Sequence, residues 1–199
     1  MKRCLLPAAL GAALVMSPSL VYAHVGVGST HGFTSGCLHP LLGLDHVLAM
    51  VSVGIIAYQL GGRAVWVAPA TFLALMAAGG ALGIRGGGIP VEELGIALSV
   101  VVLGAAVAFN MRVPLALVLA SVGLFAIFHG YAHGREMPDG TSGLAYGVGF
   151  LIAAGALHLA GISLGLLIGR LGETGRALWV RRVGGAIALT GIVLVAGAL

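Results

Sequence analysis

Six runs of apolar residues follow one another along this chain of 199 residues. Each run is close to the ~20 residues that an α-helix needs to cross a lipid bilayer. The runs cover residues 40–60, 64–84, 93–109, 113–133, 143–169 and 180–199. With a mean hydropathy of +1.11 and only 8% charged residues, the chain has too little polar surface for a water-soluble domain. We therefore predict an all-α, polytopic membrane protein with six transmembrane helices.

The N-terminus has the basic, apolar and small-residue regions of a secretory signal peptide, ending at Ala23. We predict cleavage after Ala23, which assigns residues 1–23 to a signal peptide and residues 24–199 to the mature membrane domain. An uncleaved first helix is the alternative. Cleavage would leave His24 with a free α-amine, and amine and imidazole can bind a metal ion together, although a histidine in a flexible leader can also be incidental. The polar stretch 25–36 lacks periodicity and predicts an exposed arm.

The arginines predict the orientation of the spans. If the signal is removed, the N-terminus lies outside, and the loops at 61–63, 110–112 and 170–182 face the cytoplasm. These loops carry six arginines and the opposite loops carry two, and an excess of basic residues marks the cytoplasmic side. We predict a bacterial inner-membrane protein with both mature termini on the extracytoplasmic side. Because the basic residues are scattered over short loops, they do not indicate a nucleic-acid partner.

The first span contains ionisable residues where a lipid-spanning helix should have none. In the run HPLLGLDHVLAM, Pro40 suits the first position of a helix. His39 then falls at or before the helix start, and Asp45 lies roughly 8 Å along the helix from Pro40. Charged groups at such depth are costly and mark functional sites. Because Asp45 and His46 are about 100° apart on the helix, Asp45 either shares an ion with His46 at a helix–helix seam or only orients an imidazole.

A second group of ionisable residues ends the fourth span. In FHGYAHGRE, a continuous helix would place His129, His133 and Glu136 within about 60° of one face. On the predicted topology Glu92 opens the third span on the same side, and His158 lies near the middle of the fifth. Imidazole and carboxylate together suit first-row divalent metal ions. For His158 alone, a hydrogen-bonded core histidine is an equally good interpretation.

Glycines within the spans predict close contact between helices. Gly161, Gly165 and Gly169 recur at spacing four in the fifth span, as Gly79 and Gly83 do in the second. Small residues at this spacing let helices approach closely in lipid. Homo-oligomerisation through the same faces is equally compatible with the pattern.

The runs HPLLGLDHVLAM and FHGYAHGRE resemble the two signature motifs of the HupE/UreJ family of small nickel permeases, and the resemblance covers essentially the whole chain. Members of this family have this size, a cleavable signal and six mature spans. By resemblance, the metal-handling positions are His39, Asp45, His46, His129, His133 and Glu136. An acidic residue near the third span also takes part in the family, and Glu92 or Glu93 could match it. The resemblance implies transport of nickel, or sometimes cobalt, for the proteins that mature hydrogenase or urease.

Other functions place different demands on these residues. The sequence at 140–143 matches the GxSG motif of rhomboid-like proteases, but His158 would lie roughly 24 Å from Ser142 along a straight helix. We therefore interpret that sequence as a turn and helix entry. A zinc-dependent intramembrane hydrolase would present similar His and Asp ligands. A haem protein would need axial histidines on facing helices without the clustered acids, and a sensor or chaperone would bind metal without moving it.

We predict a secondary transporter rather than an enzyme, with Ni²⁺ as the transported substrate and no prosthetic group. Cobalt, copper or zinc would accept the same ligands and are the alternative substrates. The sequence contains no nucleotide-binding motif of the GxxxxGK[ST] type. The energy for transport would therefore come from the gradient of the ion, the membrane potential or a partner.

Overall fold

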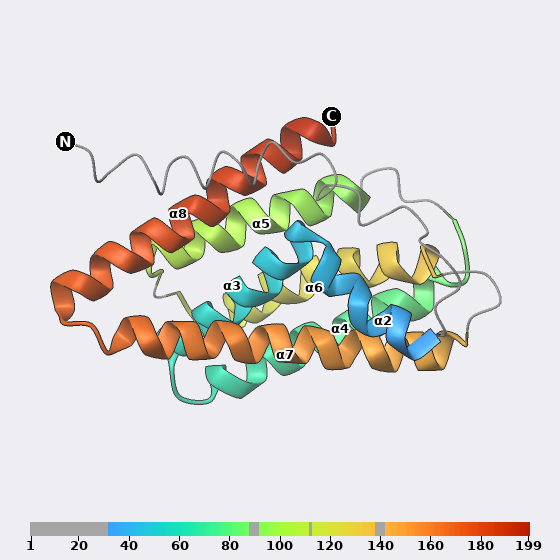
Figure 1. Ribbon diagram of the computed structural model, residues 1–199, viewed down its shortest axis with the longest axis horizontal. Helices are drawn as coiled ribbons and strands as arrows, with labels where there is room; N and C mark the ends of the chain where they lie inside the picture. The colour runs from blue at the N-terminus through green and yellow to red at the C-terminus, as the bar shows by residue number, and fades with distance from the viewer. Residues whose placement is uncertain (1–31, 88–91, 112, 138–141) are drawn as a thin grey trace.

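The computed structural model describes residues 32–87, 92–111, 113–137 and 142–199, and every regular element within them is an α-helix. In chain order the helices are α2 (Gly32–Leu42), α3 (Leu44–Leu60), α4 (Ala64–Gly83), α5 (Glu92–Phe109), α6 (Leu115–Arg135), α7 (Gly143–Gly169) and α8 (Glu173–Gly197). Figure 1 shows them as a bundle of long helices, with α8 beside α5 along one side. The predicted signal peptide, its cleavage site and His24 lie outside the described residues.

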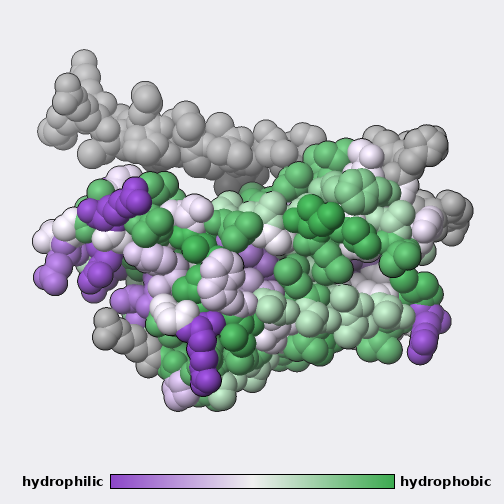
Figure 2. Space-filling model, turned by 90° about the horizontal axis from the view of Figure 1, so that it is seen from below, coloured by the Kyte–Doolittle hydropathy of each residue, from purple (hydrophilic) through white to green (hydrophobic). Residues whose placement is uncertain are grey.

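The helices have the length and composition of membrane spans. Each of α4 to α8 is long and apolar enough to cross a bilayer, and α2 and α3 meet the same test only as a pair that is bent by 80°. The described residues thus contain five candidate spans, or six with the bent pair counted as one. This agrees with the predicted all-α polytopic fold. Figure 2 shows hydrophobic side chains along the middle of the molecule and hydrophilic ones gathered mainly at the end where α7 leads to α8.

The beginning of the first span differs from the prediction. Residues 32–36, expected to be part of an exposed arm, are helical, and Gly36 is buried because α2 lies along α7 near Tyr146. Pro40 lies near the end of α2 instead of at a helix start, and His39 is inside the same helix. The chain turns at Gly43, whose backbone is extended. A Cβ at Gly43 would lie 2.8 Å from Asp45 Oδ1, so a larger residue where the two helices meet would displace the side chains of Asp45 and His46.

The N-terminal starts of the last two helices test two further predictions. Ser142 is the N-cap of α7 and its Oγ accepts a hydrogen bond from the backbone N–H of Ala145 at 3.4 Å, which confirms the predicted helix entry. The last helix begins at Glu173 instead of residue 180, so most of the predicted loop 170–182 is helical. An acidic residue in the first turn favours a helix start. The arginines in the first half of α8 are exposed, and a long arginine side chain can keep its charge in water while its stem lies along the helix.

Close packing of α3 on α7 depends on glycine, as the sequence predicted. Gly54 of α3 and Gly161 of α7 face each other, and a Cβ at Gly161 would lie 3.0 Å from the Cα of Gly54 and closer still to the carbonyl oxygen of Val51. The other predicted glycines behave alike: Gly165 and Gly169 receive the side chain of Tyr58, and Gly79 and Gly83 contact the backbone of α6. The described structure therefore uses these glycine faces within one chain.

We predict that Gly161→Ala destabilises the protein whereas Gly147→Ala on the same helix does not. The methyl group at position 161 would meet backbone atoms of α3 that have no rotamer to change, so α3 and α7 must separate. A Cβ at Gly147 meets no atom within 4 Å. Overpacking of this kind costs about 1–3 kcal/mol. Thermal unfolding in detergent measures the difference, and equal melting temperatures for the two variants would contradict this account of the helix contact.

Candidate metal centre

The break between α2 and α3 brings two histidines and an aspartate to one end of the bundle. His39 lies in the last turn of α2, while Asp45 and His46 lie in the first turn of α3. Asp45 suits that position because a helix N-terminus favours a negative charge. Its Oδ1 also accepts a hydrogen bond from the backbone N–H of His46 at 2.8 Å. The turn thus holds the carboxylate beside the imidazole that follows it.

Asp45 acts on His46 through the imidazole ring. Oδ1 of Asp45 contacts Nδ1 of His46, and Nε2 of the same ring contacts Nε2 of His133 in α6. A proton held on Nδ1 by the carboxylate leaves the lone pair on Nε2, which is the tautomer that binds a metal ion. Of the two roles that the sequence left open for Asp45, the described geometry corresponds to the orientation of His46.

A three-residue cluster, formed by His39, His133 and Glu136, could hold a metal ion. One ligand atom of each of the three residues lies within 4.8 Å of the others. His39 Nε2 is 3.6 Å from Glu136 Oε2, and His133 Nδ1 is 3.7 Å from the same oxygen. Glu136 is the C-cap of α6, and the C-terminus of a helix favours a cation. Two imidazoles and a carboxylate are a ligand set that Ni²⁺, Co²⁺, Cu²⁺ and Zn²⁺ accept.

His133 links the three-residue cluster to His46. Its Nδ1 is turned toward Glu136 and its Nε2 toward His46. The ring centroid of His133 is 4.7 Å from that of His39 and 4.3 Å from that of His46. Only 3% of His133 is exposed, whereas Glu136 remains partly accessible. A cation bound at Glu136 would therefore meet the His133 imidazole next on its way into the interior of the bundle.

His129 lies on the same face of the continuous helix α6 as His133, but outside the three-residue cluster. His129 lies one turn deeper in α6, and its Nδ1 is 2.9 Å from the carbonyl oxygen of Phe125. Its ring faces His46, with 5.2 Å between the centroids, and also contacts Phe72 of α4. The continuous helix agrees with the predicted common face, but His39 takes the third place in the cluster because α2, which packs along α7, brings this imidazole beside His133 and Glu136.

Two other predicted residues lie outside the three-residue cluster. Glu92, at the start of α5, forms an ion pair with Arg135 at the end of α6. It connects these two helices beside the cluster, and the described structure does not place it among the ligand atoms. His158 lies deep in α7, where its ring contacts Phe72 at 5.1 Å between centroids.

Aromatic residues of α7 form a wall of the site that the sequence reasoning missed. The ring of Phe150 is 4.4 Å from that of His133, and the ring of Tyr146 is 6.0 Å from that of His39. Their spacing of four residues at the beginning of a span is a signal that could have indicated a common face. Both rings cover part of the imidazoles, and a less polar surrounding of this kind strengthens the electrostatic binding of an ion.

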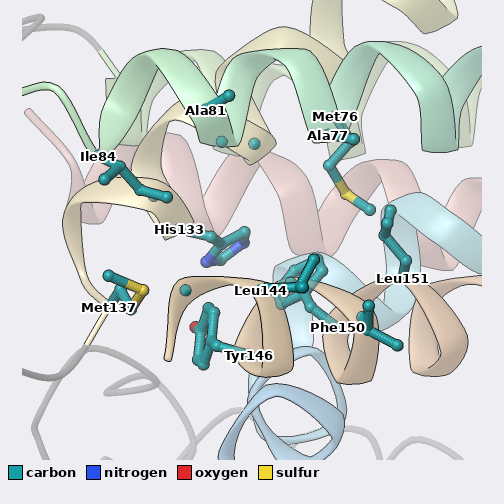
Figure 3. Close-up of a pocket in the computed structure, with 16 residues that line it drawn as sticks. Met76, Ala77, Ala81, Ile84, His133, Met137, Leu144, Tyr146, Phe150 and Leu151 are labelled. Atoms are coloured by element: carbon teal, nitrogen blue, oxygen red, sulfur yellow. The ribbon is translucent and has the colours of Figure 1, made fainter. Parts of the chain in front are cut away.

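A cavity of about 410 Å³ extends from the site between α4, α6 and α7. His133 projects into the space between α4 and α7, with Tyr146 and Phe150 of α7 beside it (Figure 3). Most of the other lining residues are apolar, among them Met76, Ile84 and Leu151. His133 and Tyr146 are the polar side chains of this lining.

Comparison with known proteins supports the motif resemblance. The family model for the HupE / UreJ protein matches residues 12–194. The chain is also 46% identical over 180 residues to Protein HupE of Rhizobium leguminosarum bv. viciae, an alignment that covers 90% of this chain and 92% of that protein. No solved structure matches the chain.

Proposed function

This chain belongs to the HupE/UreJ family of nickel and cobalt uptake proteins, and from that premise we propose that it is a permease that carries Ni²⁺ inward through the His39, His133 and Glu136 cluster. The family is one of transporters, so the chain is a membrane transporter and not an enzyme. The observation that supports the proposal best is the meeting of three ligand groups from two separate helices at one end of a membrane bundle.

The ligand chemistry supports a borderline divalent cation as the substrate. Imidazole nitrogens suit Ni²⁺, Co²⁺, Cu²⁺ and Zn²⁺, whereas Mg²⁺ and Ca²⁺ prefer sites built of oxygen atoms. Asp45 holds His46 in the metal-binding tautomer behind the cluster. Capture would begin at the partly exposed Glu136 and His39, and His133 would pass the ion to His46.

The charge distribution supports an orientation with the cluster on the extracytoplasmic side. Arg170, Arg176, Arg181 and Arg182 lie at the opposite end of α7 and in the first half of α8, and basic residues favour the cytoplasm. Inward movement of a divalent cation across a potential of 100 mV, negative inside, releases about 4.6 kcal/mol of free energy. That free energy corresponds to roughly a thousandfold accumulation, so the membrane potential alone can drive uptake toward the proteins that mature hydrogenase or urease.

The proposal predicts saturable uptake of radioactive nickel by cells that express the chain. Excess Co²⁺ should compete with nickel because it accepts the same ligands, and excess Mg²⁺ should not. Cells that carry the empty vector provide the background. Uptake no higher than this background, or equal inhibition by Mg²⁺ and Co²⁺, would contradict the proposed function. Competition by Cu²⁺ and Zn²⁺ in the same experiment ranks the alternative substrates.

A further inference from the structure

His158 is a buried imidazole far from the three-residue cluster. It is the sixteenth residue of the 27-residue helix α7, so it lies roughly 22 Å from the start of that helix. Its exposed fraction is 1%. At this level α3 and α7 are in closest contact, because a Cβ at Gly54 would meet the carbonyl oxygen of His158 itself. The backbone that carries this imidazole is therefore held firmly in the middle of the bundle.

Neither ring nitrogen of His158 has a hydrogen-bond partner among the described residues. A neutral imidazole carries one N–H donor and one lone pair, and leaving either buried and unpaired is costly. A residue that served packing alone would be replaced by an apolar side chain without this cost. The unpaired nitrogens instead indicate a ligand that is present only part of the time.

His129 presents a second unused nitrogen on the way to His158. Its Nδ1 donates to the carbonyl oxygen of Phe125 at 2.9 Å, which leaves the lone pair on Nε2. This Nε2 is buried and has no partner within the described part of the chain. His129 lies six residues before the end of α6, roughly 9 Å inside it. It is therefore deeper in the bundle than His133 and shallower than His158.

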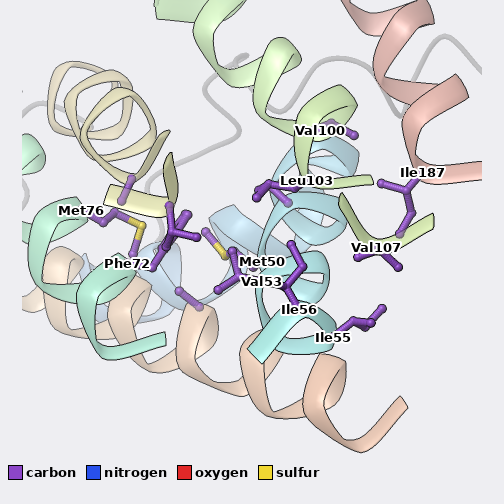
Figure 4. Close-up of a cluster of buried hydrophobic side chains, with 14 of the residues drawn as sticks. Met50, Val53, Ile55, Ile56, Phe72, Met76, Val100, Leu103, Val107 and Ile187 are labelled. Atoms are coloured by element: carbon purple, nitrogen blue, oxygen red, sulfur yellow. The ribbon is translucent and has the colours of Figure 1, made fainter. Parts of the chain in front are cut away.

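The ring of Phe72 contacts both histidines. Its ring centroid is 5.7 Å from that of His129 and 5.1 Å from that of His158, and the side chain is completely buried. Figure 4 shows it projecting from α4 into the buried hydrophobic cluster, toward Met50 and Val53 of α3. One apolar ring thus contacts both imidazoles that have an unused nitrogen.

We propose that His158 is an inner metal-binding residue, which receives the cation from His129 alongside the ring of Phe72. The inference rests on the proposed transport of nickel and extends it from capture to the crossing of the membrane interior. An imidazole at this depth accepts a borderline divalent cation and offers no oxygen ligand to Mg²⁺ or Ca²⁺. His158 would therefore favour borderline divalent cations over Mg²⁺ and Ca²⁺, as the three-residue cluster does.

The test uses the purified full-length chain in liposomes with radioactive nickel outside and an inside-negative potential. External EDTA then divides the nickel into a pool that it removes and a pool that it does not reach. For His158→Phe we expect the removable, protein-bound pool to stay within about twofold of the parent and the protected pool to fall at least tenfold. His158→Cys, which restores a metal ligand, should recover part of the protected pool. Leu159→Phe is the size control, because its side chain is 54% exposed.

The outcomes separate this inference from the proposed function. If the parent accumulates protected nickel and His158→Phe does so at the same rate, the inner residue is rejected while transport stands. If the parent accumulates none, the transport function itself is rejected. If His158→Phe does not insert into liposomes, the comparison of His158→Cys with His158→Ala decides: equal protected pools in these two variants overturn the inference, and a larger pool with cysteine supports it.

Discussion

Replacement of His133 by alanine is expected to abolish nickel uptake while the protein still inserts into the membrane. His133 supplies one nitrogen to the cluster with His39 and Glu136 and the other to His46, so its loss removes a ligand and also the connection between the two groups. Removal of a residue that only orients a metal ligand typically lowers metal affinity or activity by about 10–100-fold. We therefore expect the loss for His133→Ala to be at least about 100-fold in initial uptake rate.

The matched control for this variant is Ser121→Ala on the same helix. The Ser121 hydroxyl is exposed and donates to the carbonyl oxygen of Leu117 within the turn that precedes it, and its loss should leave uptake unchanged. Immunoblots of the membrane fraction should show both variants at the level of the parent, because α6 stays apolar enough to span the bilayer without the imidazole. Normal uptake by His133→Ala would remove the basis for the cluster as a route.

The second large effect is expected for Asp45→Asn. The amide keeps the size of the side chain but removes the negative charge that holds the proton on Nδ1 of His46. His46 is then free to adopt the other tautomer, in which Nε2 carries the proton and cannot bind a metal ion. We expect nickel uptake to fall by about 10–100-fold, less than for His133→Ala.

Glu173→Gln is the control for Asp45→Asn, since it makes the same acid-to-amide change in the first turn of another helix. Glu173 is exposed at the opposite end of the bundle, so the variant should transport at the parental rate. If Asp45→Asn transports as fast as Glu173→Gln, the carboxylate does not control the His46 tautomer. A complete loss equal to that of His133→Ala would instead indicate that Asp45 binds the ion directly.

Much of the fold could be predicted because lipid imposes a length and a composition on each span. The predicted runs at 64–84, 93–109 and 143–169 differ from the helices by no more than one residue at either end. The start of the first span was predicted wrongly because Pro40 fits the first turn of a helix as well as the position it has. The position of Pro40 is instead determined by the packing of α2 on α7, where Gly36 contacts the backbone of Tyr146. Such tertiary contacts override local preference and leave no local sequence signal.

The candidate site was predictable in its residue types and less so in its grouping. Spacing along α6 indicates which side chains share a face, but not which neighbouring helix each of them meets. His129 therefore seemed equivalent to His133, although it faces His46 and Phe72 instead of Glu136. The pairing of Glu92 with Arg135 depends on the distance between α5 and α6, which a single sequence does not contain.

The most direct measurement of the central claim is nickel X-ray absorption on the purified protein loaded with one equivalent of Ni²⁺. The account predicts a spectrum with the multiple-scattering signature of imidazole ligands and with oxygen from a carboxylate. His133→Ala should lose imidazole scattering, whereas Ser121→Ala should give the parental spectrum. A nickel spectrum without imidazole, or one that His133→Ala leaves unchanged, would contradict the assignment of the metal site to the cluster of His39, His133 and Glu136.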